Sequence, residues 1–140
     1  CKIILKDYQS ALDDFQKAID INPNNFNAIE KKGLCYYQMK QYKNAIETFN
    51  KALELKPETK ELYTYRAHCK TALNDLNGAL NDYNEVLKIY PNSALNLYNR
   101  GILKISLNQK ESGCIDLYRA KDLGFTRAQS AIQENCMKWI

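Results

Sequence analysis

The feature that most restricts the fold of this chain is a pattern that recurs every 34 residues. Three segments, starting at Tyr8, Tyr42 and Leu76, read alike and each ends in a proline. A small residue followed four places later by an aromatic residue puts a gap and a ring on one face of a helix. The proline ends each unit because it cannot continue a helix. The aligned columns are Ala11, Ala45 and Ala79; Phe15, Phe49 and Tyr83; Ala18, Ala52 and Val86; and Pro23, Pro57 and Pro91.

A second amphipathic stretch precedes each complete copy of this segment. We predict helices over 26–40, 60–73 and 94–107, with Gly33, Ala67 and Gly101 in one shared column. A side chain that small lets a second helix cross closely. Because only two to four residues connect the two helices of a unit, each unit is predicted to be an antiparallel helical hairpin. Repeated hairpins of this length are expected to stack.

These columns resemble the tetratricopeptide repeat, with a small residue at the eighth place, Ala at the twentieth, an aromatic residue at the twenty-fourth and Pro at the thirty-second. The resemblance covers nearly the whole chain. It implies an all-α, right-handed superhelical solenoid of antiparallel helix pairs with a C-terminal capping helix. The family's Trp at the fourth place is replaced by Ile29, Tyr63 and Leu97. These replacements concern packing detail.

We therefore expect one domain over 1–140. It comprises a truncated first repeat (1–25), a second (26–59), a third (60–93), a degenerate fourth (94–125) and a capping helix (126–140). Cys1 falls at the tenth place, so only the tail of that repeat's first helix is expected, and the chain is interpreted as a piece of a longer protein. In the fourth repeat Gly113 and Leu117 stand in the Ala and aromatic columns, and Gly124 suits a helix C-cap. A polar outer face and an apolar inner face identify the capping helix: Arg127, Gln129, Gln133, Glu134 and Lys138 outside, and Ala128, Ala131 and Ile132 inside.

The cysteines divide into two groups. Cys1, Cys35 and Cys69 form one repeat column and are predicted to be small apolar core residues. Cys114 and Cys136 flank the last turn, where an antiparallel hairpin would bring them to the same height. Either a disulfide that fastens the capping helix or two free thiols fits that spacing. No metal or cofactor is expected, because there is no CxxC motif and His68 is the only histidine.

Composition narrows the function classes. The net charge of +4 is spread along the chain without a basic run, which argues against nucleic-acid binding. No apolar stretch is long enough for membrane insertion. No nucleophile–base pair or phosphate loop is evident, so we do not expect an enzyme. The compartment is unknown: a soluble protein of the cytoplasm or the bacterial periplasm fits.

The predicted function is protein binding. In a stack of hairpins the first helices line a concave surface, and their unpacked stripe is aromatic, apolar and nearly uncharged. Such a stripe usually binds a peptide or helix of another protein, because tyrosine supplies contact area and a polar end. The alternative is that these residues pack between neighbouring helices. The candidate groove residues are Glu30, Lys31, Leu34, Tyr37, Tyr65, His68, Tyr98, Asn99 and Ile102.

Other functions of such repeats can be compared with the residue types found here. The family's clamp for chaperone carboxylates requires Asn, Lys and Arg where this chain has Lys31, Glu61 and Tyr65, so we do not expect that ligand. Homotypic assembly through the cut first repeat stays open as an alternative. Binding of RNA by helical repeats is less favoured, because one base-facing column changes from Glu30 to Thr64 to Tyr98.

Overall fold

The computed structural model describes residues 2–136, with side chains from residue 7 onward. Cys1 and Lys138 lie outside the described residues. The described part is helical, as predicted, and none of its helices is both long and apolar enough to cross a membrane. The helices are α1 (Lys2–Ile21), α2 (Phe26–Gln38), α3 (Tyr42–Leu55), α4 (Lys60–Ala72), α5 (Leu76–Ile89), α6 (Ala94–Ser106), α7 (Lys110–Asp122) and α8 (Arg127–Asn135).

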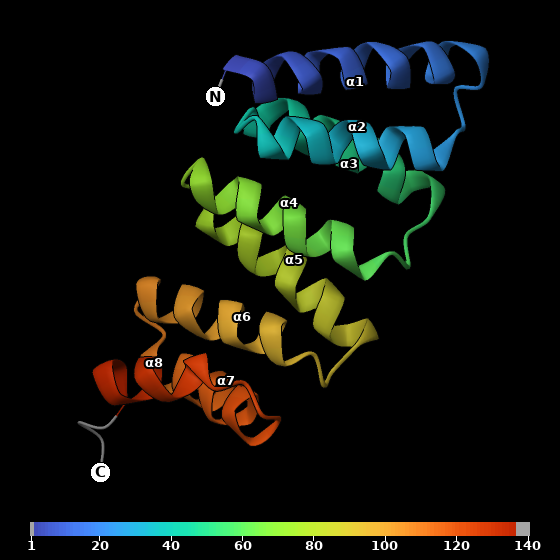
Figure 1. Cartoon of the computed structure of the whole chain (residues 1–140). Coiled ribbons are helices and arrows are strands. Elements are labelled where there is room, and N and C mark those ends of the chain that lie inside the picture. The colour runs from blue at the N-terminus through green and yellow to red at the C-terminus, as the bar shows by residue number, and fades with distance from the viewer. Residues whose placement is uncertain (1, 137–140) are drawn as a thin grey trace. The chain divides into compact units, whose positions relative to one another are not determined.

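The chain divides into two compact units. Unit 1 is Cys1–Asn74 and contains α1 to α4, and unit 2 is Asp75–Ile140 and contains α5 to α8. Within each unit, helices adjacent in sequence lie side by side and run antiparallel (Figure 1). The all-α hairpin architecture is therefore confirmed, whereas a single continuous domain over 1–140 stays a prediction.

Tight turns reverse the chain inside the hairpins. After α2, Lys40 adopts a left-handed backbone conformation (φ 62°), and the amide of Gln41 donates to the carbonyl of Tyr36 at 2.9 Å. Asn108 (φ 65°) reverses the chain after α6 in the same way. The bond that spans five residues satisfies a carbonyl that the helix end leaves unpaired. Three residues thus suffice to connect α2 to α3 and α6 to α7.

The first repeat differs from the expectation. We predicted the tail of a separate first helix before the helix that contains Ala11, but Lys2–Ile21 is one continuous helix. The physical reason is length. A tail of a few residues forms too few hydrogen bonds and buries too little surface to stand as a helix of its own, so continuing the existing helix is favoured.

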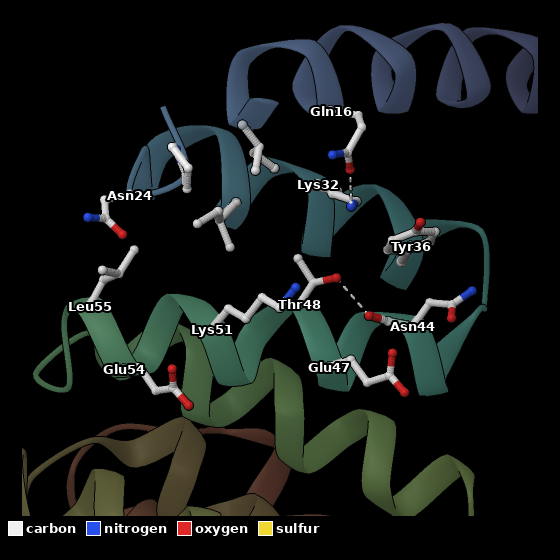
Figure 2. A pocket seen from close by; sticks show the side chains of 13 residues that line it. Gln16, Asn24, Lys32, Tyr36, Asn44, Glu47, Thr48, Lys51, Glu54 and Leu55 are labelled. Carbon is white, nitrogen blue, oxygen red and sulfur yellow. Dashed lines mark hydrogen bonds between the residues drawn. The ribbon is translucent and has the colours of Figure 1, made fainter. Parts of the chain in front are cut away.

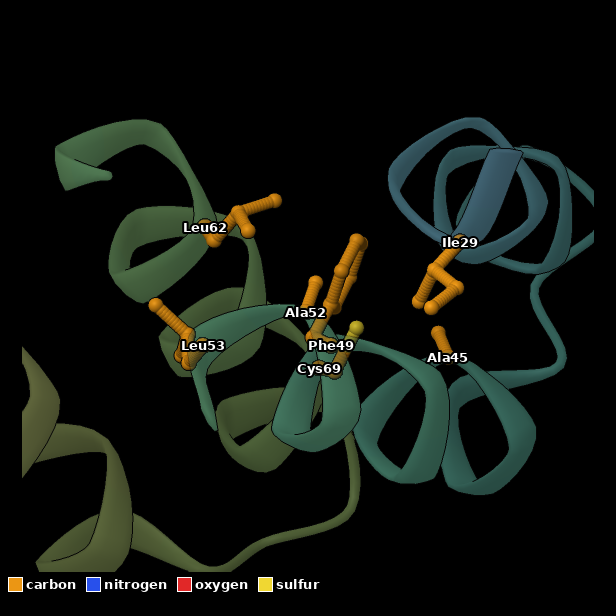
Figure 3. Packing of buried hydrophobic residues seen from close by; sticks show 7 residues of the cluster. All are labelled: Ile29, Ala45, Phe49, Ala52, Leu53, Leu62 and Cys69. Carbon is orange, nitrogen blue, oxygen red and sulfur yellow. The ribbon is translucent and has the colours of Figure 1, made fainter. Parts of the chain in front are cut away.

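Unit 1 is held by the gap-and-ring packing that the repeat predicts. Phe49 is fully buried among Ile29, Ala45 and Leu62 (Figure 3). A Cβ atom placed on Gly33 would lie 2.6 Å from Cε1 of Phe49, so the glycine of α2 makes room for the ring of α3. Cys69 is buried in the same cluster, as predicted for its column, whereas Cys35 is only half-buried.

In unit 2 the helix crossing at the glycine column is packed differently. Leu117 stands where the other repeats have an aromatic residue, and it is fully buried. Because leucine is smaller, α6 and α7 approach until a Cβ on Gly101 would lie 2.8 Å from the carbonyl oxygen of Gly113. Two glycines on facing helices permit this backbone contact. The degenerate fourth repeat therefore remains a closely packed hairpin.

The last helix closes unit 2. Gly124, at the end of α7, has a φ of 95°, as expected for a C-cap. The predicted inner residues Ala128, Ala131 and Ile132 are buried, and of the predicted outer residues Arg127, Gln133 and Glu134 are exposed. A disulfide joins Cys114 of α7 to Cys136, with 5.9 Å between their Cα atoms. Both cysteines belong to the core cluster that contains Leu117.

Candidate protein-binding face

In unit 1 the predicted groove residues of α2 and α4 form one cluster. The rings of Tyr37 and Tyr65 meet edge to face with centroids 5.1 Å apart, and Tyr37 Oη lies 3.3 Å from Nδ1 of His68. Tyr65 also stacks on the buried ring of Phe49 at 6.1 Å. The cluster therefore links the first helices of two successive repeats and rests on the core beneath them.

The side chains of Tyr37, Tyr65 and His68 are half-buried. Their exposure lies between that of an open binding surface and that of residues packed between helices, the two alternatives that the sequence left open. Burial lowers the pKa of His68 below its ordinary value and raises the pKa of Tyr37. At neutral pH both are therefore uncharged. The rings are fixed by packing and still retain surface, so the cluster can offer aromatic contact and hydrogen bonds at little entropic cost.

The remaining unit 1 candidates have different exposures. Leu34 packs against the core cluster and is half-buried. Glu30 is half-buried, whereas Lys31 is exposed. On this face the aromatic cluster thus has an aliphatic neighbour and an exposed cation.

In unit 2 the candidates of α6 pack against the capping region. The ring of Tyr98 stacks on Phe125 with centroids 4.9 Å apart, and the guanidinium of Arg127 lies 5.3 Å from the Tyr98 centroid. Ile102 packs against the core cluster that contains the disulfide, and Asn99 is half-buried. Here the structure adds Phe125 and Arg127 to the residues that the sequence identified.

No binding role was predicted for Phe125, and Arg127 was predicted only as part of the polar outer face of the capping helix. A signal was present, because Phe125 is an aromatic residue in the short loop between α7 and α8. Such a residue in a loop is expected to find a packing partner. Tyr98 is that partner.

Unit 1 also has a cavity of about 480 Å³ between α1, α2 and α3, which was not predicted from the sequence. Lys32, Tyr36 and Lys51 line it together with Thr48, and the amine of Lys32 donates to Oε1 of Gln16 at 2.6 Å (Figure 2). These residues match no known short motif. The sequence feature that could have indicated this cavity is a cation that recurs every 34 residues, at Lys32, Arg66 and Arg100.

Comparison with known proteins supports the repeat assignment. A family model described as Tetratricopeptide repeat matches residues 63–93. The crystal structure of MamA is similar with a TM-score of 0.83 and 19% identity, covering 88% of this chain and 73% of that one. YrrB, described as a TPR protein with an unusual peptide-binding site, gives a TM-score of 0.81 and 23% identity, covering 94% of this chain and 69% of that one.

A second family model, described as Regulator of microtubule dynamics protein 1-3, matches residues 6–77, just over half of the chain. No curated protein sequence matches significantly. The similar structures show the fold, and the two family models agree with it. The chain is a tetratricopeptide-repeat protein and belongs to the regulator of microtubule dynamics protein 1-3 family.

Proposed function

We propose that this chain is a protein-interaction module that binds a peptide or helix of a partner protein on the first helices of its repeats, α2 and α4 in unit 1 and α6 in unit 2. The observation that carries the proposal is the half-buried cluster of Tyr37, Tyr65 and His68. Its rings are held in place before a partner arrives, which lowers the entropic cost of binding.

The chemistry of the face indicates what it would recognise. Tyr37 and His68 are uncharged at neutral pH, and Leu34 is apolar. Affinity would then come from apolar contact and hydrogen bonds, with a handful of aromatic residues contributing most of it. Lys31 is positioned to favour a partner with an acidic residue nearby.

Unit 2 offers a contact of its own. Arg127 lies over both Tyr98 and Phe125, at 5.3 and 6.0 Å from the two ring centroids. A guanidinium fixed above aromatic rings is preorganised to bind a planar acidic or amide group. We propose it as the binding element of that unit, with Asn99 and Ile102 beside it.

Two comparisons support a protein as the partner. YrrB, which shares the fold, is described as having a peptide-binding site. The family description names regulators of microtubule dynamics, and the matched residues 6–77 contain the whole cluster of Tyr37, Tyr65 and His68. A microtubule-associated protein or the microtubule itself is therefore the first partner to test.

The test begins with co-sedimentation of the purified chain with assembled microtubules, and with affinity capture followed by mass spectrometry. The partner found is then titrated in pure form against two variants. Tyr37→Phe combined with Tyr65→Phe removes two hydroxyls and keeps the rings, and Lys31→Glu reverses an exposed charge. We expect each variant to weaken binding by about threefold to tenfold, in the range of one hydrogen bond or one interface charge.

Matched controls separate binding from folding. Tyr118→Phe alters an exposed tyrosine of α7, and Lys43→Glu reverses an exposed lysine of α3, both away from the proposed face. These two should bind like the wild type. Equal affinity of the face variants and the controls, at unchanged helicity, would contradict the proposed face.

A further inference from the structure

A column of cations recurs in the first helices of the repeats, on a stripe different from that of the tyrosines. Each member bonds an amide oxygen that lies 16 residues earlier, on the second helix of the preceding repeat. The same pairing occurs in both units, so the cation is a regular part of this repeat. The pairs are Lys32 with Gln16 at 2.6 Å, Arg66 with Asn50 at 2.8 Å and Arg100 with Asn84 at 3.1 Å.

In unit 2 the cation has a carboxylate partner from its own chain. Arg100 donates to both oxygens of Asp116, at 2.7 and 2.8 Å, and Lys104 lies 3.1 Å from the same group. Asp116 is only 2% exposed. Buried charge of one sign requires the other sign nearby. The neighbouring cavity of about 420 Å³ is lined by Arg100 and by Arg119, whose guanidinium donates to the carbonyl of Pro91 at 3.4 Å.

For Lys32 of unit 1, the residue equivalent to Asp116 is not a carboxylate. Two repeats before Asp116 stands Thr48, whose hydroxyl donates to the carbonyl of its own helix at Asn44, 2.8 Å away. Asp82 occupies the column in between and is also buried. Within residues 7–136, neither Lys32 nor Lys51 has a carboxylate at ion-pair distance.

The cavity beside Lys32 is open to a ligand of matching charge. Lys51, which is the counterpart of Arg119, lines it and extends toward α2 (Figure 2). Glu47 and Glu54 also line it, but Figure 2 shows their carboxylates on the side of α3 away from α2. Burial lowers the pKa of Lys32, and the repulsion of Lys51 lowers it further, against a smaller opposing effect of Asp20. Lys51 thus adds a second positive charge to the wall that contains Lys32.

We propose that this cavity binds a carboxylate, supplied by an aspartate or glutamate side chain of an acidic peptide, with Lys32 and Lys51 as its two cationic donors. The bound group would take the place that Asp116 holds beside Arg100. Tyr36 lines the same wall, and the amine of Lys32 lies 5.9 Å from the centroid of its ring. A volume of about 480 Å³ accommodates a side chain together with its adjoining backbone.

This site is separate from the tyrosine cluster. On a helix, Lys32 and Tyr36 share one stripe, and Leu34 and Tyr37 lie on a different one. The inference therefore does not depend on the proposed function. An acidic peptide can bind at Lys32 whether or not the aromatic face has a partner, and a failure of one proposal leaves the other standing.

The experiment uses fluorescein-labelled hexaglutamate as the probe and fluorescence anisotropy as the readout. Lys32→Gln and Lys51→Gln should each raise the Kd by about tenfold. Lys43→Gln, which removes an exposed lysine of α3 outside the cavity, should change it less than about twofold. Competition by acetate and by inorganic phosphate at equal ionic strength distinguishes a carboxylate site from a general anion site, and acetate is expected to compete better.

The second test introduces a carboxylate of the chain itself beside Lys32. Thr48→Asp restores the residue type of its column, so the introduced carboxylate should pair with Lys32, preserve the fold and abolish probe binding. Thr48→Asn, which has the same shape without the charge, should retain binding. The proposal is overturned if the lysine variants bind like the wild type, if Lys43→Gln loses as much affinity, or if hexaglutamate does not bind. Loss of folding in Thr48→Asp would also contradict it, because that carboxylate is expected to find a partner.

Discussion

At the scale of single residues, the glycines Gly33 and Gly101 serve one function against different neighbours. A side chain at Gly33 would meet the ring of Phe49, whereas one at Gly101 would meet the backbone oxygen of Gly113. A buried ring can shift slightly, but a helix backbone moves only with the whole helix. The loss of stability on substituting a glycine therefore depends on which atoms lie opposite it.

We predict that Gly101→Ala lowers the free energy of unfolding by about 2–3 kcal/mol and Gly33→Ala by about 1–2 kcal/mol, after the better helix propensity of alanine is included. Urea unfolding followed by circular dichroism measures both. Ser106→Ala, an exposed substitution in the same helix as Gly101, serves as the control and should be nearly neutral. Equal stability of Gly101→Ala and the wild type would show that α6 and α7 do not approach this closely.

His68 makes the stability of unit 1 depend on pH. Its folded-state pKa is depressed by burial, so the unfolded chain takes up a proton first as the pH falls. The stability is complete above the ordinary histidine pKa of about 6.5 and is lost as the pH falls from there through the folded-state pKa. We expect a lower urea midpoint at a pH of about 5.5 than at about 7.5.

Because His68 is the only histidine, its ring signals in NMR report the same titration directly. His68→Gln should flatten the stability profile between pH values of about 7.5 and 5.5, since carboxylates titrate mainly below that window. An unchanged slope in this variant would assign the pH dependence to other groups.

At the scale of secondary-structure elements, α8 is attached to unit 2 by apolar contacts and by the Cys114–Cys136 disulfide. Its three buried residues are Ala128, Ala131 and Ile132, two of which are small. A helix of nine residues is not stable alone. The crosslink therefore contributes a large share of what keeps this helix in place.

We predict that reduction, or Cys136→Ser, lowers the stability of unit 2 by about 3 kcal/mol, the loop-entropy value for a sequence separation of 22. Hydrogen exchange should show lost protection in α7 and α8 and unchanged protection in α1 to α3. Cys35→Ser, which alters a free thiol, is the control. Exchange that increases equally in all helices would mean that the molecule unfolds as one unit.

At the scale of the whole molecule, the repeat columns predicted most of the architecture. The starts of the helices at Phe26, Lys60 and Ala94 agree with the structure to the residue, because each follows a proline-containing turn. Of the three residues at the N-cap positions, Asn25 accepts a hydrogen bond from a helix amide, whereas Thr59 and Ser93 do not. The columns could not predict the continuous helix at Lys2–Ile21. Whether a short tail folds back or continues a helix depends on its tertiary packing, which no local pattern encodes.

The candidate sites were less predictable. The stripe of Tyr37, Tyr65 and Tyr98 followed from helical periodicity, but how far each ring is buried depends on neighbours such as Phe49 and Phe125 that belong to other elements. The cavity at Lys32 was not predicted because it becomes apparent only when the residues at equivalent positions of the repeats are compared. Only the pairing of Arg100 with Asp116 shows what Thr48 replaces.

The column that contains Thr48, Asp82 and Asp116 has an evolutionary consequence. In a tandem array, one ancestral ion pair is copied with every duplication, and each copy can then mutate without removing the others. Exchanging an acid for a hydroxyl in a single copy leaves a cation without its counterion in a scaffold that its sister copies keep intact. Under the proposal above, one such exchange at Thr48 is enough to create a receptor for an acidic side chain in a single hairpin of the array.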